Sequence, residues 1–117
     1  MRIRLKRVYE EAADDDGYRV LVDRIWPRGV SKDKAKLDVW LKELAPSNEL
    51  RRWFGHDRER WDEFSAAYRA ELDEGDGQRL EELREHARNG RLTLLFAARD
   101  TQYNNAVVLA DYLEDGR

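Results

Sequence analysis

The segment that most constrains the fold is the run Leu-Thr-Leu-Leu-Phe at residues 92–96, which is nearly all apolar in a chain of which 40% of the residues are charged. A strand with one face in water alternates apolar and polar side chains, whereas a strand covered on both faces is apolar almost throughout. The run therefore predicts a strand that is buried on both sides.

Two earlier segments also have the pattern of strands. Residues 2–9 alternate apolar and basic side chains, as in a half-buried strand, and residues 14–17 end this pattern. Residues 18–23 begin with alternation and continue as a β-branched apolar run, which is typical of a more central strand. Pro27 then ends the extended structure, since it has no amide proton to donate to a ladder.

Helical periodicity takes over after this strand. A first helix is expected to start at Ser31 or Asp33 and to end at Pro46, with an apolar stripe made by Leu37, Trp40, Leu41 and Leu44. Capping and stop residues predict four more helices: a short one from Ser47 to Gly55, the longest over residues 57–73, a fourth stopped by left-handed backbone at Asn89 and Gly90, and a last one that begins at Asn104 and Asn105.

These elements define the fold class. With 117 residues, the chain is long enough for one domain with a single core. We therefore expect one compact α/β domain over residues 1–117, built on a small, mostly parallel three-stranded sheet that is flanked by helices. Strands joined through helices are usually parallel, so the loops after residues 20–22 and 92–96 open on the same edge of the sheet.

The composition excludes several kinds of site. The chain has no cysteine, which excludes disulfides, thiol nucleophiles and cysteine-ligated metals, and it shows no cluster with metal-ligand spacing. No apolar stretch has the length of a signal peptide or a membrane span. We expect a cytoplasmic protein with no metal and no membrane partner, and the sequence identifies no cofactor.

The loop after the strand at residues 18–23 carries the first part of a candidate site. It contains Arg24, Trp26 and Arg28 on either side of Pro27. A planar guanidinium clamps a phosphate or a carboxylate with two hydrogen bonds, and an indole ring stacks on a base or another ring. This loop therefore indicates a pocket for an anion.

The loop after residues 92–96 carries the second part. Arg99 follows the strand, and Asn104 and Asn105 open the last helix, whose free amides also suit an anion. Two weaker candidates are considered for proton transfer, Asp100 in this loop and His56 in the sequence Trp-Phe-Gly-His-Asp. If the strands are parallel, the arginines of both loops converge.

Each candidate also has a structural interpretation. Asp23 or Asp100 can pair with the arginines and thereby hold the loops together. All four tryptophans, Trp26 included, are explained well as packing residues, and the two asparagines are explained as helix caps. His56 can be a loop histidine that hydrogen-bonds to the backbone.

The net charge of −3 conceals an uneven distribution. Residues 24–36 hold five basic side chains and one acidic, whereas residues 71–85 hold seven acidic and two basic. A pocket for a small anionic ligand, phosphate-like or nucleotide-like, is therefore favoured over a nucleic-acid surface, which the overall acidity disfavours. A protein-interaction module is the remaining class. Both catalysis and the oligomeric state stay open.

Five runs of sequence resemble one family. They are VDRIWPRGVSK (22–32), WLKELAPS (40–47), LRRWFGHD (50–57), LLFAARD (94–100) and NNAVVL (104–109). Over nearly its whole length the chain is similar to the YeaO-like proteins, domain of unknown function 488. The resemblance implies a small bacterial-type α/β cytoplasmic protein without an established activity. A longer branch of the family carries cysteine and histidine after the last strand, where this chain has Arg99, Asp100, Asn104 and Asn105, so no thiol or metal role is carried over.

Overall fold

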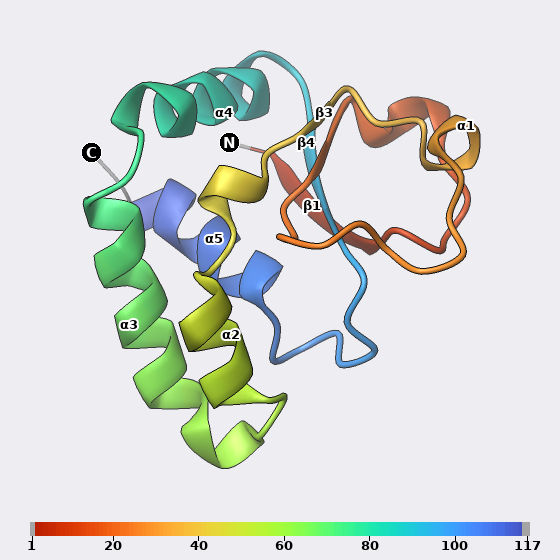
Figure 1. Ribbon diagram of the computed structural model, residues 1–117. Helices are drawn as coiled ribbons and strands as arrows, with labels where there is room; N and C mark the ends of the chain where they lie inside the picture. Colours follow the sequence, from red (N-terminus) through yellow and green to blue (C-terminus); the bar gives the residue numbers. More distant parts are fainter. Residues whose placement is uncertain (1, 116–117) are drawn as a thin grey trace.

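The computed structural model describes residues 2–115, and the apolar run of the sequence is the strand β4 (Leu92–Phe96), in the interior of a sheet. β4 lies between β1 (Ile3–Arg7) and β2 (Tyr18–Leu21), and β3 (Val39–Trp40) pairs with the other side of β2. All three pairings are parallel (Figure 1). Every residue of β4 is buried, so the prediction of a strand covered on both faces is confirmed.

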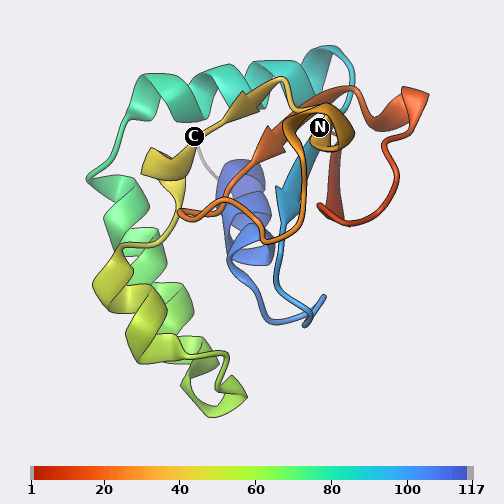
Figure 2. The same cartoon turned by 45° about the vertical axis from the view of Figure 1, so that its right-hand side comes forward.

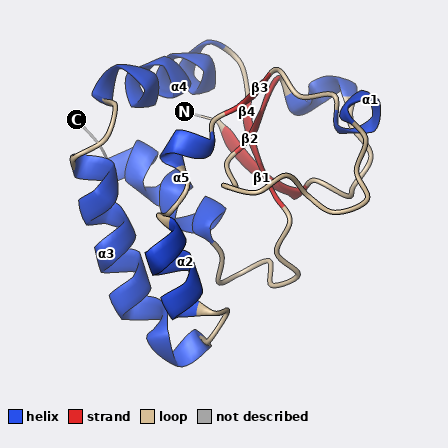
Figure 3. Cartoon of the chain, in the orientation of Figure 1, coloured by secondary structure: helices blue, strands red, loops and turns tan. Residues whose placement is uncertain are grey.

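The two faces of the sheet are covered differently. The longer helices α2 (Asn48–Phe54), α3 (Trp61–Asp73), α4 (Gly77–Asn89) and α5 (Asn105–Asp115) lie on one side, and α2 packs beside α3 (Figures 1 and 2). The short helix α1 (Lys32–Ala35) and the loops around it cover the other side (Figure 3). The expected α/β class is therefore confirmed.

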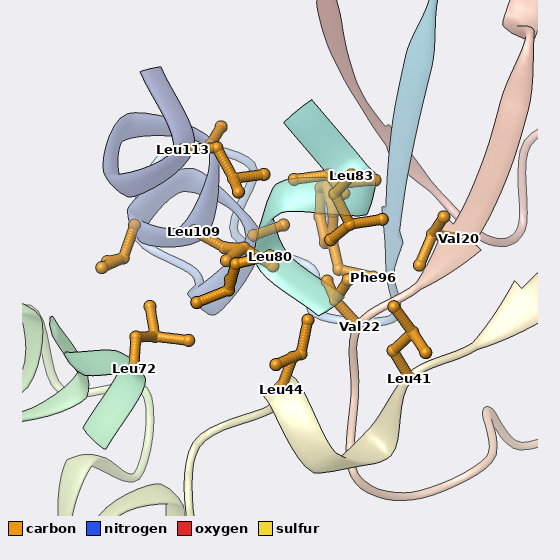
Figure 4. Close-up of a cluster of buried hydrophobic side chains, with 14 of the residues drawn as sticks. Val20, Val22, Leu41, Leu44, Leu72, Leu80, Leu83, Phe96, Leu109 and Leu113 are labelled. Atoms are coloured by element: carbon orange, nitrogen blue, oxygen red, sulfur yellow. The ribbon is translucent and has the colours of Figure 1, made fainter. Parts of the chain in front are cut away.

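The alternation of side chains along β2 and β4 divides the core in two. Val20 and Val22 point with Phe96 toward the helices, where they meet leucines of α3, α4 and α5 (Figure 4). Leu21 and Leu95 point the other way and pack with Ala35 of α1. This is the period of two expected of strands with an apolar layer on each face.

The face of the sheet that α1 covers, called the outer face below, also holds a buried carboxylate. This is the carboxylate of Asp16, in the crossover from β1 to β2. Its side chain is fully buried and accepts hydrogen bonds from Arg4 at 2.8 Å, Lys6 at 3.0 Å and Arg19 at 2.5 Å. Burial by itself raises the pKa of Asp16, but the backbone N–H of Ala13 and the three cations outweigh it and hold this pKa well below its usual range. Asp16 is therefore ionised and joins β1 to β2.

The expected helix from Ser31 or Asp33 to Pro46 is wrong. α1 ends at Ala35 with Lys36 in the left-handed region (φ 47°), and the chain then becomes β3, which gives a sheet of four strands rather than three. Asp38 attaches this segment to the edge of β2, because its N–H donates to the carbonyl of Arg19 at 2.9 Å and its carboxylate accepts from the N–H of Arg19 at 2.7 Å.

The apolar spacing in this segment was misleading for a physical reason. Leu37 and Trp40 pack into the outer core, whereas Leu41 and Leu44 pack into the core under the helices. The four side chains therefore serve two faces of the sheet and do not form one helical stripe.

The other predicted helices are present, with changes at their ends. α2 has the expected Ser47 cap and the left-handed Gly55 (φ 53°). The helix expected over residues 57–73 begins with a 3-10 turn capped by Asp57, and α3 proper is no longer than α4, at 13 residues each. α4 ends at Asn89 as predicted, but Gly90 is extended (φ 175°) and not left-handed.

Replacing Asp16 by asparagine is expected to lower the free energy of unfolding by about 3–5 kcal/mol at pH 7, because it leaves the buried Arg19 and the half-buried Lys6 without a counter-charge. Since the pKa of Asp16 is lowered by folding, its contribution is complete above the unfolded pKa of about 3.9 and is lost as the pH falls below it. Urea unfolding from pH 7 to pH 3 should therefore show a weaker acid dependence in Asp16→Asn than in the parent.

Asp15→Asn is the matched control, because the side chain of Asp15 is 72% exposed and pairs with Arg4 at the surface. It should change the unfolding free energy by less than about 1 kcal/mol. Equal stability of Asp16→Asn and the parent at pH 7 would contradict the role given to this carboxylate.

Candidate functional site

A cavity of about 850 Å³ opens at the carboxyl edge of the sheet. Most of its wall comes from three segments: the loop after β2, the C-terminal end of α2 with the turn that follows, and the loop between β4 and α5. Pro46, which precedes α2, and Phe64 of α3 complete the lining. The two strand loops meet here because β2 and β4 are parallel neighbours, as the sequence predicts.

All eight candidate residues from the sequence line this cavity. They are Arg24, Trp26, Arg28, His56, Arg99, Asp100, Asn104 and Asn105. Lining a cavity does not make each of them a ligand-binding group, because several side chains are engaged with the protein itself. The hydrogen bonds of each side chain show whether it holds the fold together or is available to a ligand.

Asp23 joins the ends of β2 and β4 beside the cavity. Its carboxylate accepts hydrogen bonds from the backbone N–H of Ala97 at 2.8 Å and from Nδ2 of Asn105 at 3.1 Å. Burial raises the pKa of Asp23, and the two hydrogen bonds together with the charges of His56 and Arg51 oppose that rise. The side chain therefore fixes both site loops.

Arg24 has the structural role that the sequence left open, but with different partners. Its Nε donates to the carbonyl of Pro46 at 2.9 Å and its Nη2 to the carbonyl of Ala45 at 3.1 Å. These bonds fasten the loop after β2 to the segment that leads into α2. Arg24 therefore builds a wall of the cavity, and within residues 2–115 its Nη1 makes no hydrogen bond.

Trp26 is likewise engaged in packing. Its Nε1 donates to the carbonyl of Val30 at 2.7 Å, and its ring meets the Trp40 ring edge-on with centroids 5.4 Å apart. The ring is half-buried in the outer core of the sheet. The packing interpretation therefore accounts for Trp26.

The two asparagines also act within the fold. Oδ1 of Asn104 accepts from the N–H of Val107 at 3.1 Å, which makes Asn104 the side-chain cap of α5. Nδ2 of Asn105 donates to the carbonyl of Val22 at 2.9 Å as well as to Asp23. Together they fix the start of α5 against the end of β2.

The two candidates for proton transfer have different surroundings. Asp100 accepts from the N–H groups of Gln102 and Tyr103 and pairs with Arg58 at 2.9 Å, and these contacts lower its pKa. It is therefore an ionised turn residue. His56 is exposed and left-handed (φ 59°), and its imidazole makes no hydrogen bond within the part of the chain that the structure describes.

Two arginines of the cavity were missed by the sequence analysis. Arg51 and Arg52 lie in the last turn of α2 and line the cavity beside the loop arginines. The signal was present in the run Leu-Arg-Arg-Trp-Phe-Gly-His-Asp, but placing its arginines at the sheet edge requires the packing of α2. Five arginines in all line the cavity, against two aspartates.

Three of these arginines have guanidinium groups without a partner. Among residues 2–115, the side chains of Arg28, Arg52 and Arg99 make no hydrogen bond or ion pair, and all three residues are exposed. The hypothesis that Asp23 or Asp100 pairs with the loop arginines is therefore wrong. Neither carboxylate pairs with Arg24, Arg28 or Arg99, since Asp23 holds N–H groups and Asp100 holds Arg58.

The loops that carry these free guanidiniums are themselves held in place. Arg7, at the end of β1, donates through Nε to the carbonyl of Ala98 at 2.9 Å and through Nη2 to that of Ala97 at 3.0 Å. The hydroxyl of Tyr9 donates to the carbonyl of Arg28 at 3.0 Å. The backbone positions of Arg28 and Arg99 are thus fixed while their side chains stay available.

Residues 2–115 lack two other features. No group of three or more histidine or carboxylate side chains is placed to hold a metal ion. No helix in this range has the length and apolar character needed to span a membrane.

Comparison with known proteins supports the resemblance seen in the sequence. A family model described as the inactive DUF488-N3 subclade (DUF488-N3i) matches residues 2–116. The uncharacterized protein YeaO of Escherichia coli K12 is 47% identical over 115 residues, which cover 97% of each chain. The uncharacterized protein Rv3073c of Mycobacterium tuberculosis H37Rv is 46% identical over 112 residues, 96% of this chain and 93% of its own. No solved structure matches the chain.

Truncation of Arg24 should destabilise the protein, whereas truncation of Arg99 should leave its stability almost unchanged. Arg24→Ala is expected to lower the free energy of unfolding by about 1.5–3 kcal/mol, because the buried carbonyls of Ala45 and Pro46 lose a charged donor. Arg99→Ala should stay within about 0.5 kcal/mol of the parent, since the exposed side chain of Arg99 makes no hydrogen bond or ion pair within residues 2–115. Urea unfolding of the two variants measures the difference, and equal losses would refute the division between wall and free arginines.

Proposed function

The chain belongs to the inactive DUF488-N3 subclade, and on that premise we propose that it binds a small phosphate-like or nucleotide-like anion at the carboxyl edge of its sheet, without chemical turnover. The observation that carries this proposal is the cavity with five arginines, three of which have no partner within residues 2–115. A guanidinium group recognises phosphate or carboxylate oxygens through two parallel hydrogen bonds.

Electrostatics favours an anion in this cavity. Arg28, Arg52 and Arg99 come from three different segments and lie around one cavity, so their like charges repel each other. Asp23 and Asp100 also line the cavity, but neither carboxylate forms an ion pair with these three arginines, since their hydrogen bonds go to other groups. A bound anion offsets it and brings three segments of the chain into contact with one ligand.

The surroundings of the titratable groups support binding rather than catalysis. Asp100 is held as an anion by backbone N–H groups and by Arg58, so it has no proton to give near neutral pH. His56 has no carboxylate partner to orient its ring within the described chain. The word "inactive" in the description of the matching family model agrees with a binding role.

Phosphate and pyrophosphate should raise the melting temperature of the protein, measured at constant ionic strength with chloride as the reference salt. A ligand at about 100 times its Kd adds about 2.7 kcal/mol to the free energy of unfolding. Arg28→Ala and Arg99→Ala should each remove most of this shift, because each deletes a free guanidinium. Neither should lower the melting temperature without ligand by more than a few degrees.

Arg79→Ala is the matched control, because Arg79 is an exposed arginine of α4 that does not line the cavity. It should keep the full phosphate shift. A shift that is the same in all three variants would show that phosphate acts through the general surface and would refute the proposal.

Single-stranded and duplex DNA should bind no more tightly than nonspecific contacts, with a Kd of about 10⁻⁶ M or weaker at physiological salt. The reason is that the acidic residues 71–85 repel a long polyanion, whereas a small anion enters the cavity alone. Fluorescence anisotropy with a labelled oligonucleotide at several salt concentrations measures this. Tight, steeply salt-dependent binding that is lost when Arg28, Lys32 and Lys34 are changed to glutamate would favour a nucleic-acid surface instead.

A further inference from the structure

We infer that the anion for this cavity is a phosphate monoester with a ring and a hydroxyl-bearing organic part, such as a nucleoside monophosphate, and not inorganic phosphate; this inference rests on the proposed function. The first argument is size. The cavity of about 850 Å³ lies within the range of about 300–1,000 Å³ that is typical of sites for drug-sized organic ligands. A single inorganic phosphate leaves most of such a volume to water.

The second argument is the apolar wall of the cavity. Ile25, Pro27, Phe54 and Phe64 line it together with the arginines. The Phe54 and Phe64 rings are stacked with centroids 4.2 Å apart, which gives this wall a rigid aromatic base. Ile25 is 57% exposed, more than any other large apolar residue within residues 2–115. Pro27, Phe54 and Phe64 are already buried, so Ile25 supplies most of the apolar surface that a ligand can cover here, and covering it favours a ligand with an apolar or planar part.

The third argument is the carboxylate of Asp23 within the same cavity. Each of its oxygens accepts one hydrogen bond from the protein, from Ala97 or from Asn105, and a carboxylate oxygen has room for a second. A negative charge beside Asp23 is unfavourable, whereas a hydroxyl or amino group donates to it. The ligand therefore places its phosphate on the free arginines and a neutral donor group over Asp23.

The cavity thus sets three requirements for its ligand, a phosphate, a hydroxyl group and a ring, and one molecule can meet all of them. Phosphate oxygens meet Arg28, Arg52 or Arg99, a hydroxyl group meets Asp23, and a ring covers the apolar wall near Ile25. Phosphorylated sugars satisfy the first two requirements, and a simple aryl phosphate satisfies the first and the third. A nucleoside monophosphate satisfies all of them, which sets an order of affinity that an experiment can test.

Isothermal titration with five probes tests this order: inorganic phosphate, ribose 5-phosphate, phenyl phosphate, AMP and adenosine. We expect ribose 5-phosphate and phenyl phosphate to bind more tightly than inorganic phosphate, and AMP to bind at least tenfold more tightly than it. Adenosine, which has no phosphate, should bind at least tenfold more weakly than AMP.

Two variants separate the parts of the site. Arg99→Gln should weaken every phosphate-bearing probe, whereas Ile25→Ser should weaken phenyl phosphate and AMP severalfold and leave inorganic phosphate unchanged. Leu5→Ser is the control for Ile25→Ser, because Leu5 is also an exposed apolar residue (37%) but lies on β1 outside the cavity lining. It should change none of the affinities.

The outcomes distinguish the two proposals. If inorganic phosphate binds in an Arg99-dependent manner and no organic phosphate binds more tightly, the organic-ligand inference is overturned and the proposed function stands. If no phosphate-bearing probe binds, or if AMP and adenosine bind equally well, the proposed function itself is overturned.

Discussion

The fold depends on a buried carboxylate that joins two strands which are not neighbours in the sheet. β1 and β2 follow each other in the sequence, yet β4 lies between them, so their crossover has to span a strand that comes much later in the chain. Parallel strands are usually joined by a helix with an apolar face, but residues 8–17 here form only loops and a 3-10 turn. Asp16 anchors this crossover to Arg4 and Lys6 of β1 and to Arg19 of β2.

The same outer face has a polar half and an apolar half, and the site lies beyond the apolar half. Near the amino ends of the strands the face holds ion pairs, while toward the carboxyl ends it holds Leu21, Leu95 and the half-buried Trp26. The three cations bonded to Asp16 all have a carboxylate partner, whereas Arg28, Arg52 and Arg99 at the cavity have none within residues 2–115. Unpartnered like charges on a well-held scaffold are a local conflict of the kind expected at a binding site.

The sequence was sufficient for the strand β4, for the α/β class and for the edge at which the polar loops meet, because these follow from a buried apolar run and from the geometry of parallel strands. It was not sufficient for β3, since the apolar spacing from Leu37 to Leu44 fits a helix as well as a chain that crosses a sheet edge. Nor did the sequence show that Arg24 is a structural residue whereas Arg99 is available to a ligand. Residue type does not reveal that Arg24 donates hydrogen bonds to carbonyls of a distant segment.

The interior position of β4 also has a consequence for the order in which the molecule is made. A ribosome releases β1 and β2 long before residues 92–96, so during synthesis both strands lack the neighbour that they share. The central pairings of the sheet are then all between segments distant in sequence, which is the property that makes folding slow. The nascent chain therefore carries two open strand edges until its last strand emerges, and it is during this interval that it is exposed to misassembly with other chains.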